Sequence, residues 1–294
     1  MKVSATQAPR IELEARLYLV SDKPWWDAIR DISRRIPRTE SSRHTLGRAT
    51  SWWHGMTVEA YATLGFQKGS VCWGVPLYGT MPAAATKHLL DVLTRGIASQ
   101  TFGSYCMVEG AYIDHARNTI VHLALQCAAE DDNITHLFFQ DQDVVVPEGT
   151  IEALMAHQKP VVGAVYFGRD RGNLPIAFDI EPFRRIEDID LEGLNKVGGV
   201  GMGATLIELD VFRGMARHFN DAWFFSCREN AASVEDGTRR TGEDIWFAQR
   251  CSEMGIDIYL DGAASCGHIG TVEITAEHYK EARRWRQDQS SVVS

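Results

Sequence analysis

The sequence has little that would tie it to a membrane or to an oxidising compartment. Its six cysteines are scattered and never form a C-x-x-C pair, a pattern that indicates buried, reduced thiols and neither disulfides nor a zinc site. No apolar run approaches the ~20 residues needed to span a bilayer, and the N-terminus lacks the apolar core of a signal peptide. Internal repeats and low-complexity runs are also missing. These absences predict a cytoplasmic protein with no membrane span.

Charge is distributed unevenly in a composition that is otherwise ordinary for a globular protein, 45% hydrophobic and 23% charged. The net charge is −9, but residues 1–68 hold eleven Lys and Arg against seven Asp and Glu, which leaves −13 for the remainder. Six of the basic residues are arginines between Arg30 and Arg48. We expect residues 1–69 to be a helical and irregular accessory region. Its arginines and tryptophans fit either a nucleic-acid surface or a solvated face over an aromatic core.

From residue 70 onward, apolar strand patterns alternate with amphipathic helix patterns. Strands are expected at 71–77, 105–108, 137–139, 161–166, 205–209, 223–226 and 256–260, and helices at 82–99, 114–129, 148–157, 210–219 and from 242. This order predicts an α/β fold, with a mostly parallel, doubly wound sheet and helices on both faces. The domain is expected to cover residues 70–274, followed by a charged helix and a frayed tail at 275–294.

Two carboxylates follow the apolar strand expected at 137–139. Asp141 and Asp143 come directly after the L-F-F run, and Pro147 then marks a turn into the next helix. The carboxyl edge of an α/β sheet is where ligands bind. Oxygen ligands there hold a divalent cation together with substrate phosphates. The alternative is a strand end with two solvated acids in a turn.

Several further motifs share one order along the chain. They are V-C-W-G-V-P-L-Y-G, A-R-N-T-I-V-H-L-A-L, H-L-F-F-Q-D-Q-D-V-V-V-P, V-V-G-A-V-Y, G-G-V-G-M-G-A-T-L-I, T-G-E-D-I-W-F-A-Q-R-C-S-E-M-G and C-G-H-I-G. Over residues 70–270 this order resembles glycosyltransferases of the GT-A fold, especially compact members of the inverting family that includes polysaccharide and chitin synthases. The resemblance implies a hexosyltransferase-type enzyme that uses Mn²⁺ or Mg²⁺ and a nucleotide-diphosphate sugar donor, with a UDP-sugar favoured. It leaves the acceptor open between a saccharide, a protein and modified DNA, and it leaves the oligomeric state open.

The resemblance also implies roles for the acidic and histidine residues. Asp141 contacts the sugar or ribose of the donor beside the metal, Asp143 binds the metal, and His268 completes the metal shell. Asp244 is the expected catalytic base, with Glu243 beside it. An acid in the first turn of a helix is kept ionised by the helix dipole, which suits a base. Taken alone, the Glu-Asp pair also fits an ordinary helix start, and a lone histidine in a turn is only a candidate ligand.

Three residues are expected near the donor on the same grounds. Pro76 and Tyr78, at the end of the first strand, match the place of the nucleotide base and ribose. Gly201 lies in G-G-V-G-M-G, which precedes a strand and so is not a dinucleotide fingerprint. Its lack of a side chain would let the backbone approach the donor sugar or acceptor.

Arg117 and Asn118 open the A-R-N helix and are expected to help bind the donor. Arg117 would reach a phosphate or the Asp-x-Asp loop, or else pair with Asp114 within its own helix. The sequence departs from the family in having Gln142 between the two acids. It also lacks the Q-x-x-R-W signature of processive synthases, which favours addition of a single sugar.

Other functions remain open from the sequence. A haloacid-dehalogenase-like phosphatase would use Asp141 as its nucleophile, although that family carries the motif on its first strand. A nucleotidyltransferase would need a basic, Gly-rich loop that Gly79-Thr80-Met81-Pro82 does not supply. A non-enzymatic nucleic-acid-binding protein would use the arginines between Arg30 and Arg48. A glycosyltransferase acting on modified DNA would combine the transferase and the nucleic-acid-binding functions.

Overall fold

The computed structural model describes residues 49–53, 56–64, 69–79, 81, 83–109, 112–169, 173–180, 182–229, 240–270 and 273–292. The arginines between Arg30 and Arg48, with the rest of the accessory region before residue 49, lie outside this part of the chain. Within it, no helix is both long and apolar enough to cross a bilayer.

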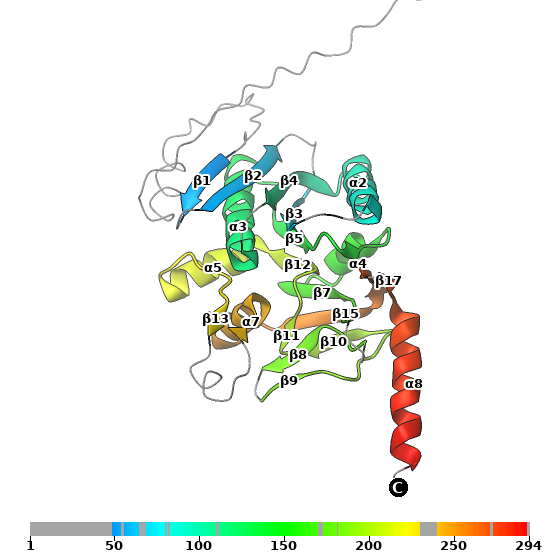
Figure 1. Ribbon diagram of the computed structural model, residues 1–294. Coiled ribbons are helices and arrows are strands. Elements are labelled where there is room, and N and C mark those ends of the chain that lie inside the picture. The colour runs from blue at the N-terminus through cyan, green and yellow to red at the C-terminus, as the bar shows by residue number, and fades with distance from the viewer. Residues whose placement is uncertain are drawn as a thin grey trace, which may run out of the picture.

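Strands and helices alternate along most of the described chain (Figure 1). The strands are β1 (Ala49–Trp53), β2 (Met56–Leu64), β3 (Val71–Leu77), β4 (Phe102–Glu109), β5 (His136–Gln140), β6 (Val144–Val145), β7 (Val161–Val165), β8 (Ala177–Ile180), β9 (Phe183–Arg185), β10 (Leu194–Val197), β11 (Gly199–Val200), β12 (Ala204–Glu208), β13 (Arg228–Glu229), β14 (Arg240–Thr241), β15 (Ile258–Ser265), β16 (Gly267–Ile269) and β17 (Glu273–Ile274). The helices are α2 (Ala83–Ala98), α3 (Ile113–Glu130), α4 (Thr150–Ala156), α5 (Leu209–Phe219), α7 (Glu243–Glu253) and α8 (Ala276–Val292).

One mixed sheet organises the described residues. Its nine strands lie in the order β1-β2-β4-β3-β5-β12-β7-β15-β10. Strands β1, β3, β4, β5, β7 and β15 run in one direction, and β2, β10 and β12 run in the opposite one. The α/β class with a mostly parallel sheet is therefore confirmed, and the architecture is consistent with a GT-A-like fold. Three parallel strands, β4, β3 and β5, end at the edge that carries the Asp-x-Asp motif.

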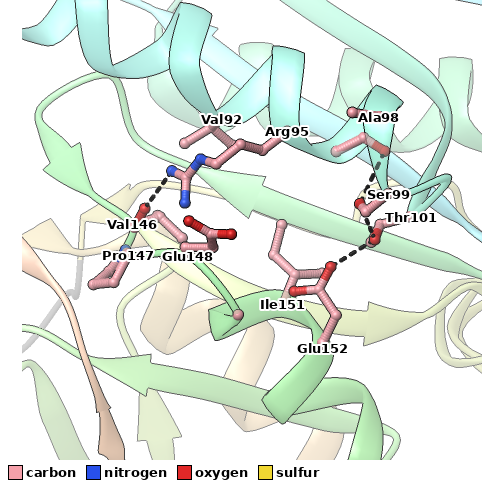
Figure 2. A pocket seen from close by; sticks show the side chains of 12 residues that line it. Val92, Arg95, Ala98, Ser99, Thr101, Val146, Pro147, Glu148, Ile151 and Glu152 are labelled. Carbon is pink, nitrogen blue, oxygen red and sulfur yellow. Dashed lines mark hydrogen bonds between the residues drawn. The ribbon is translucent and has the colours of Figure 1, made fainter.

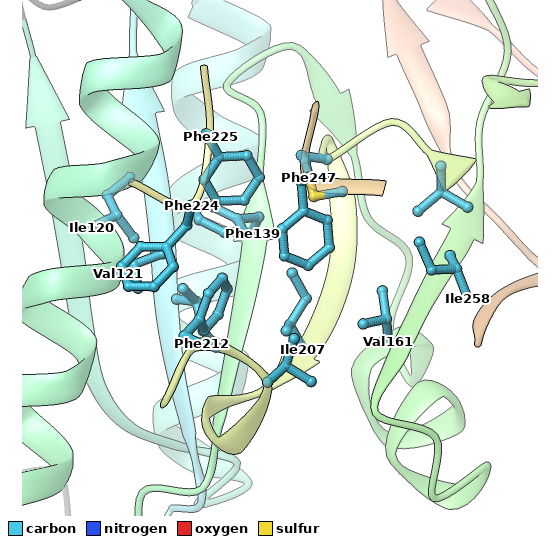
Figure 3. Packing of buried hydrophobic residues seen from close by; sticks show 14 of the residues in the cluster. Ile120, Val121, Phe139, Val161, Ile207, Phe212, Phe224, Phe225, Phe247 and Ile258 are labelled. Carbon is cyan, nitrogen blue, oxygen red and sulfur yellow. The ribbon is translucent and has the colours of Figure 1, made fainter. Parts of the chain in front are cut away.

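Both faces of the sheet are covered by helices, as expected. On one face α3, α5 and α7 pack on an aromatic core in which Phe225 stacks on Phe247 and meets Phe139 edge-on (Figure 3). On the other face α2 and α4 pack around Trp73, which stacks on Phe102. Because apolar side chains cover the middle of β5 on both faces, the strand is rigid where it delivers its acids.

Three sequence-based expectations are wrong. Residues 49–53 and 56–64, expected to be helical or irregular, form β1 and β2, and β2 pairs with β4 in the main sheet. The alternation of polar and apolar residues in M-T-V-E-A-Y-A-T-L is a strand pattern. Residues 223–226 are not a strand. The Asn118 side chain makes the hydrogen bonds to the backbone of Phe224 and Phe225 that strand pairing would use. Residues 266–270 are not simply a turn, because Gly267 and His268 pair with β6.

Candidate active site

The two carboxylates lie at the carboxyl end of β5, where the sheet opens to solvent. The Asp141 amide donates to the Gly203 carbonyl at 3.0 Å, and the Val144 amide donates to the Asp141 carbonyl at 3.0 Å, which closes a tight turn. The side chains of Asp141 and Asp143 are 27% and 26% exposed. Both acids are therefore held by backbone contacts yet remain accessible.

Arg117 joins three elements of the site. Its Nη2 donates to Asp141 Oδ1 at 2.9 Å and its Nε to Glu243 Oε1 at 3.0 Å, while its guanidinium lies over the Phe139 ring. The side chain is only 3% exposed, and Nη1 has no partner among the described residues. The expected contact with the Asp-x-Asp loop is present, and a salt bridge to Asp114 is not among the ion pairs of the described chain. Burial raises the pKa of Asp141 against the opposing charge of Arg117.

Asp143 and His268 come together from distant parts of the sequence. His268 Nε2 lies 3.6 Å from Asp143 Oδ2, and His268 Nδ1 donates to the Phe167 carbonyl at 2.8 Å. That second contact fixes the ring and leaves Nε2 as the nitrogen that faces Asp143. Burial acts to raise the pKa of Asp143, but His268 and Arg169 outweigh it, and the pKa lies below its usual value.

The pair fits a divalent cation whose remaining ligands come from phosphate and water. In the described chain no three His, Cys, Asp or Glu side chains gather as a complete metal site. A cation that binds nucleotide phosphates needs only one or two carboxylates from the protein, so Asp143 with His268 suffices. Arg169 Nη1 lies 2.9 Å from the same Asp143 oxygen. A cation and this arginine would therefore compete for one carboxylate.

Asp244 lies in the first turn of α7, one residue after Glu243. Burial, reinforced by the negative charge of Glu243, raises the pKa of Asp244 to about 7. Desolvation therefore opposes the expected effect of the helix dipole, and the carboxyl group is only partly ionised near neutral pH. A carboxyl group that titrates near neutrality is well matched to accepting and releasing a proton.

Tyr78 and Pro76 differ in their surroundings at the end of β3. Tyr78 is 70% exposed, and the Gln142 side chain bonds its backbone on both sides, accepting from the amide at 2.8 Å and donating to the carbonyl at 2.6 Å. Pro76 is buried within the strand, paired with Val108, so it shapes the strand and offers no surface to a ligand. Of the two, only Tyr78 presents a ring to solvent.

Asn118 is a structural residue, contrary to expectation. Its amide nitrogen donates to the carbonyls of Asp114 and Phe225, and its oxygen accepts from the amides of Phe224 and Phe225. All four hydrogen-bonding positions are used, so none is left for a donor substrate. These bonds replace strand pairing for residues 223–226 and fix that segment against α3.

Gly201 also has a structural explanation. A Cβ at this position would lie 2.2 Å from the Tyr166 hydroxyl, so the ring already fills the space that a ligand was expected to use. The same hydroxyl accepts from the Gly203 amide at 3.1 Å, and the Tyr166 ring meets His268 edge-on. Tyr166 thus connects the glycine-rich loop to the histidine.

Sequence reasoning missed the parts played by Gln142, Arg169 and Tyr166. Gln142 was seen only as a departure from the family pattern, although an amide beside an exposed loop commonly bonds backbone. Arg169 lies in none of the motifs, and Tyr166 ends the V-V-G-A-V-Y motif without a role implied for it. Their importance depends on the β7 end lying beside β16, which only the fold reveals.

A separate groove of about 440 Å³ lies between α2 and the β6–α4 turn (Figure 2). Arg95 crosses it to the Val146 carbonyl, and Thr101 donates to Glu152. None of the predicted site residues lines it. The candidate site is therefore the sheet edge and not this groove.

No protein-family model and no curated protein matches the chain. Among solved structures, the crystal structure of A197 from STIV is similar at 16% identity, over 68% of this chain and 85% of that one, with a TM-score of 0.44. A glycosyltransferase involved in the glycosylation of the major capsid of PBCV-1 is similar at 11% identity, over 56% of this chain and 74% of that one, with a TM-score of 0.31. Neither similarity identifies the chemistry, which rests on the residues of the site.

Proposed function

We propose that the protein is a glycosyltransferase that moves a sugar from a nucleoside-diphosphate sugar to an acceptor hydroxyl. The observation that carries the proposal is the meeting of Asp143 and His268 at 3.6 Å, on the same sheet edge as the Asp141–Arg117–Glu243 ion-pair chain. A phosphate-bound cation and a proton-accepting carboxylate are the two requirements of this reaction, and the edge offers groups for both.

Mn²⁺ or Mg²⁺ held by Asp143 and His268 would supply charge neutralisation to the departing diphosphate. Asp141, fixed by Arg117, would hold the sugar or ribose of the donor. Tyr78 would stack on the nucleotide base, with a UDP-sugar as the favoured donor, and Gln142 would keep its backbone in place. With these roles, the nucleotide base would lie at the end of β3 and the diphosphate beside β16.

Asp244 would take the proton of the acceptor hydroxyl. In that step the hydroxyl oxygen forms a bond to the anomeric carbon, the bond from that carbon to the diphosphate oxygen breaks, and the diphosphate leaves with the electron pair. A single displacement of this kind inverts the anomeric carbon. With a pKa of about 7, Asp244 is substantially ionised at neutral pH and still basic enough to accept the proton.

The test is a screen of nucleotide sugars with Mn²⁺ or Mg²⁺ that measures released nucleoside diphosphate, with Asp143→Asn as the matched control. We expect turnover of at least one donor, and its loss in the variant. The proposal would be overturned if no donor reacts and none raises the melting temperature. Product stereochemistry, read by NMR of the anomeric proton, tests inversion separately.

The phosphatase alternative predicts a different outcome in the same assay. Asp141 would then be a nucleophile that attacks phosphomonoesters, although Arg117 already occupies its Oδ1. Hydrolysis of p-nitrophenyl phosphate that Asp141→Asn abolishes, without donor turnover, would favour that function. Strongly salt-dependent DNA binding without either activity would favour the nucleic-acid-binding alternative.

A further inference from the structure

Aromatic side chains lie at the start of α3 and in the segment after α5. Tyr112, at the start of α3, is 66% exposed, and Trp223, in the segment after α5, is 38% exposed. The ring of His115 meets that of Trp223 edge-on, with 5.3 Å between centroids. Tyr112 is the N-cap residue of α3 and His115 is the third residue of the helix, so the two positions are neighbours at the helix start. We call Tyr112, His115 and Trp223 the aromatic band.

The backbone under Trp223 is held rigidly. Its amide donates to Asp221 Oδ1 at 3.0 Å, and Arg250 donates both to its carbonyl and to the two Asp221 oxygens, the latter at 2.8 Å. Arg250 is itself packed against the rings of Phe219 and Trp246. An exposed ring on an immobilised backbone is preorganised, so binding to it costs little conformational entropy.

The band is connected to the proposed base through Cys227. The Cys227 amide donates to Asp114 Oδ2 at 3.1 Å, and its Sγ lies 4.0 Å from Glu243 Oε2, next to Asp244. Cys227 follows Trp223 by four positions, a span of at most about 14 Å when fully extended. An acceptor longer than one sugar ring can therefore lie on the band while its terminal hydroxyl reaches the base.

The charge around the band decides which acceptor fits. Two arginines lie beside the band, and both are buried and paired: Arg117 with Asp141 and Glu243, and Arg250 with Asp221. Asp114 adds a carboxylate that no described cation pairs with. The described side chains around the band therefore offer a phosphate backbone no cation that is not already paired, although nucleic-acid binding depends on cations that neutralise phosphates. A neutral saccharide has no such requirement, and the C–H faces of its rings pack on aromatic side chains.

We propose that the aromatic band binds the acceptor and that the acceptor is a neutral oligosaccharide. The inference rests on the proposed glycosyltransferase function, which it makes more specific. Among a saccharide, a protein and modified DNA, it selects the saccharide. It also assigns Tyr112 and Trp223 to substrate binding, although no sequence motif marked either residue.

The experiment measures equilibrium binding of the full chain to neutral hexasaccharides (β-1,4-glucan, α-1,4-glucan, chitin-type and α-mannan) and to a 20-nucleotide oligo(dT). Calorimetry without any nucleotide sugar makes the result independent of catalysis. We expect one hexasaccharide to bind, with affinity reduced about fivefold to tenfold in Tyr112→Ala and in Trp223→Ala, as for the loss of one stacking contact. Leu90→Ala, which removes an exposed apolar side chain on α2, is the matched control and should bind as the wild type does.

Each outcome bears on the inference. No hexasaccharide binding, or binding unchanged in both Tyr112→Ala and Trp223→Ala, overturns it, and so does preferential binding of the oligo(dT). Tyr112 is so exposed that its variant should fold even where Trp223→Ala does not. If a donor is turned over but the saccharide affinity is unchanged in both variants, the aromatic band is not the acceptor site, while the proposed function stands. Band-dependent saccharide binding without turnover of any donor contradicts the proposed function alone.

Discussion

Arg117 donates to Asp141 across 2.9 Å, and this contact ties the first turns of α3 to the end of β5. The arginine also pairs with Glu243, so one buried cation holds two carboxylates from different elements. Removing one partner of a buried ion pair is far more costly than removing an exposed one, because it leaves charge uncompensated in a poorly solvated place.

Arg117→Met should therefore destabilise the fold as well as abolish activity. We expect a loss of about 3 kcal/mol or more in the free energy of unfolding. Urea titration followed by circular dichroism measures it. Arg213→Met, which removes an exposed ion pair with Asp210 on α5, should change stability by no more than about 0.5 kcal/mol. Equal effects in the two variants would contradict the bridging role of Arg117.

His268→Ala should weaken cation binding. Its Nε2 faces Asp143, and its Nδ1 bond to Phe167 fixes the ring, so the substitution removes an oriented ligand. We expect the affinity for Mn²⁺ in the presence of UDP, measured by calorimetry, to fall at least about tenfold. His218→Ala, at an exposed position on α5, controls for general loss of an imidazole. Unaltered Mn²⁺ affinity in His268→Ala would exclude the histidine from the cation site.

Arg169→Ala should have the opposite effect and strengthen the binding of the cation. Arg169 occupies the Asp143 oxygen that faces His268, and its side chain is 50% exposed. Because an exposed ion pair contributes up to about 1 kcal/mol, removing this competitor should raise the Mn²⁺ affinity about twofold to fivefold. Arg184→Ala, which breaks the exposed pair with Asp179, should leave the affinity unchanged. A lower affinity in Arg169→Ala would show that the arginine supports the cation and does not compete with it.

Asp244 makes both activity and stability depend on pH. As a base it acts when ionised, so kcat should rise as the pH increases through about 7. Asp244→Asn should lower kcat by about 10²-fold or more and remove this inflection. The raised pKa means that the folded protein binds this proton more tightly than the unfolded chain does. The contribution of Asp244 to stability is thus complete below its unfolded pKa and is lost as the pH rises through about 7.

Thermal unfolding at two pH values checks the sign of this effect. Asp244→Asn keeps an acceptor for the Ile245 amide but removes the titrating group. The stability of the variant, measured relative to that of the wild type, should therefore be higher at pH 8 than at pH 5. A wild type that gains stability over the variant between pH 5 and pH 8 would contradict the assignment of a raised pKa.

Gln142→Ala should reduce donor affinity without unfolding the chain. The amide makes two bonds to the Tyr78 backbone, and each contributes about 0.5–1.5 kcal/mol in net terms. If Tyr78 stacks on the nucleotide base, its backbone support should appear as a UDP affinity several-fold weaker. Tyr78→Ala should give a loss of similar size by removing the ring itself. A UDP affinity unaffected by both substitutions would move the base-binding position away from β3.

The parts of the site that the sequence predicts are those carried by single elements. Asp141 and Asp143 stand out because a buried apolar strand precedes them, and Asp244 because a helix begins beside it. What the sequence hides depends on contacts between elements. Asn118 looks available until the segment after α5 folds against it, and the strand pairing of His268 requires β6, which is only two residues long. Desolvation of Asp244 likewise arises from packing, so its raised pKa does not follow from its position in the helix.

Strand β16 pairs with β6 so that His268 lies opposite Val144, and the Ile269 amide donates to the Asp143 carbonyl at 2.7 Å. Main-chain hydrogen bonds, more than side-chain rotamers, therefore set how far the imidazole lies from the carboxylate. Since side chains alternate along a strand, one residue inserted between Gly267 and His268 would turn the imidazole to the opposite face. The number of residues in this segment matters as much to the site as which residues they are.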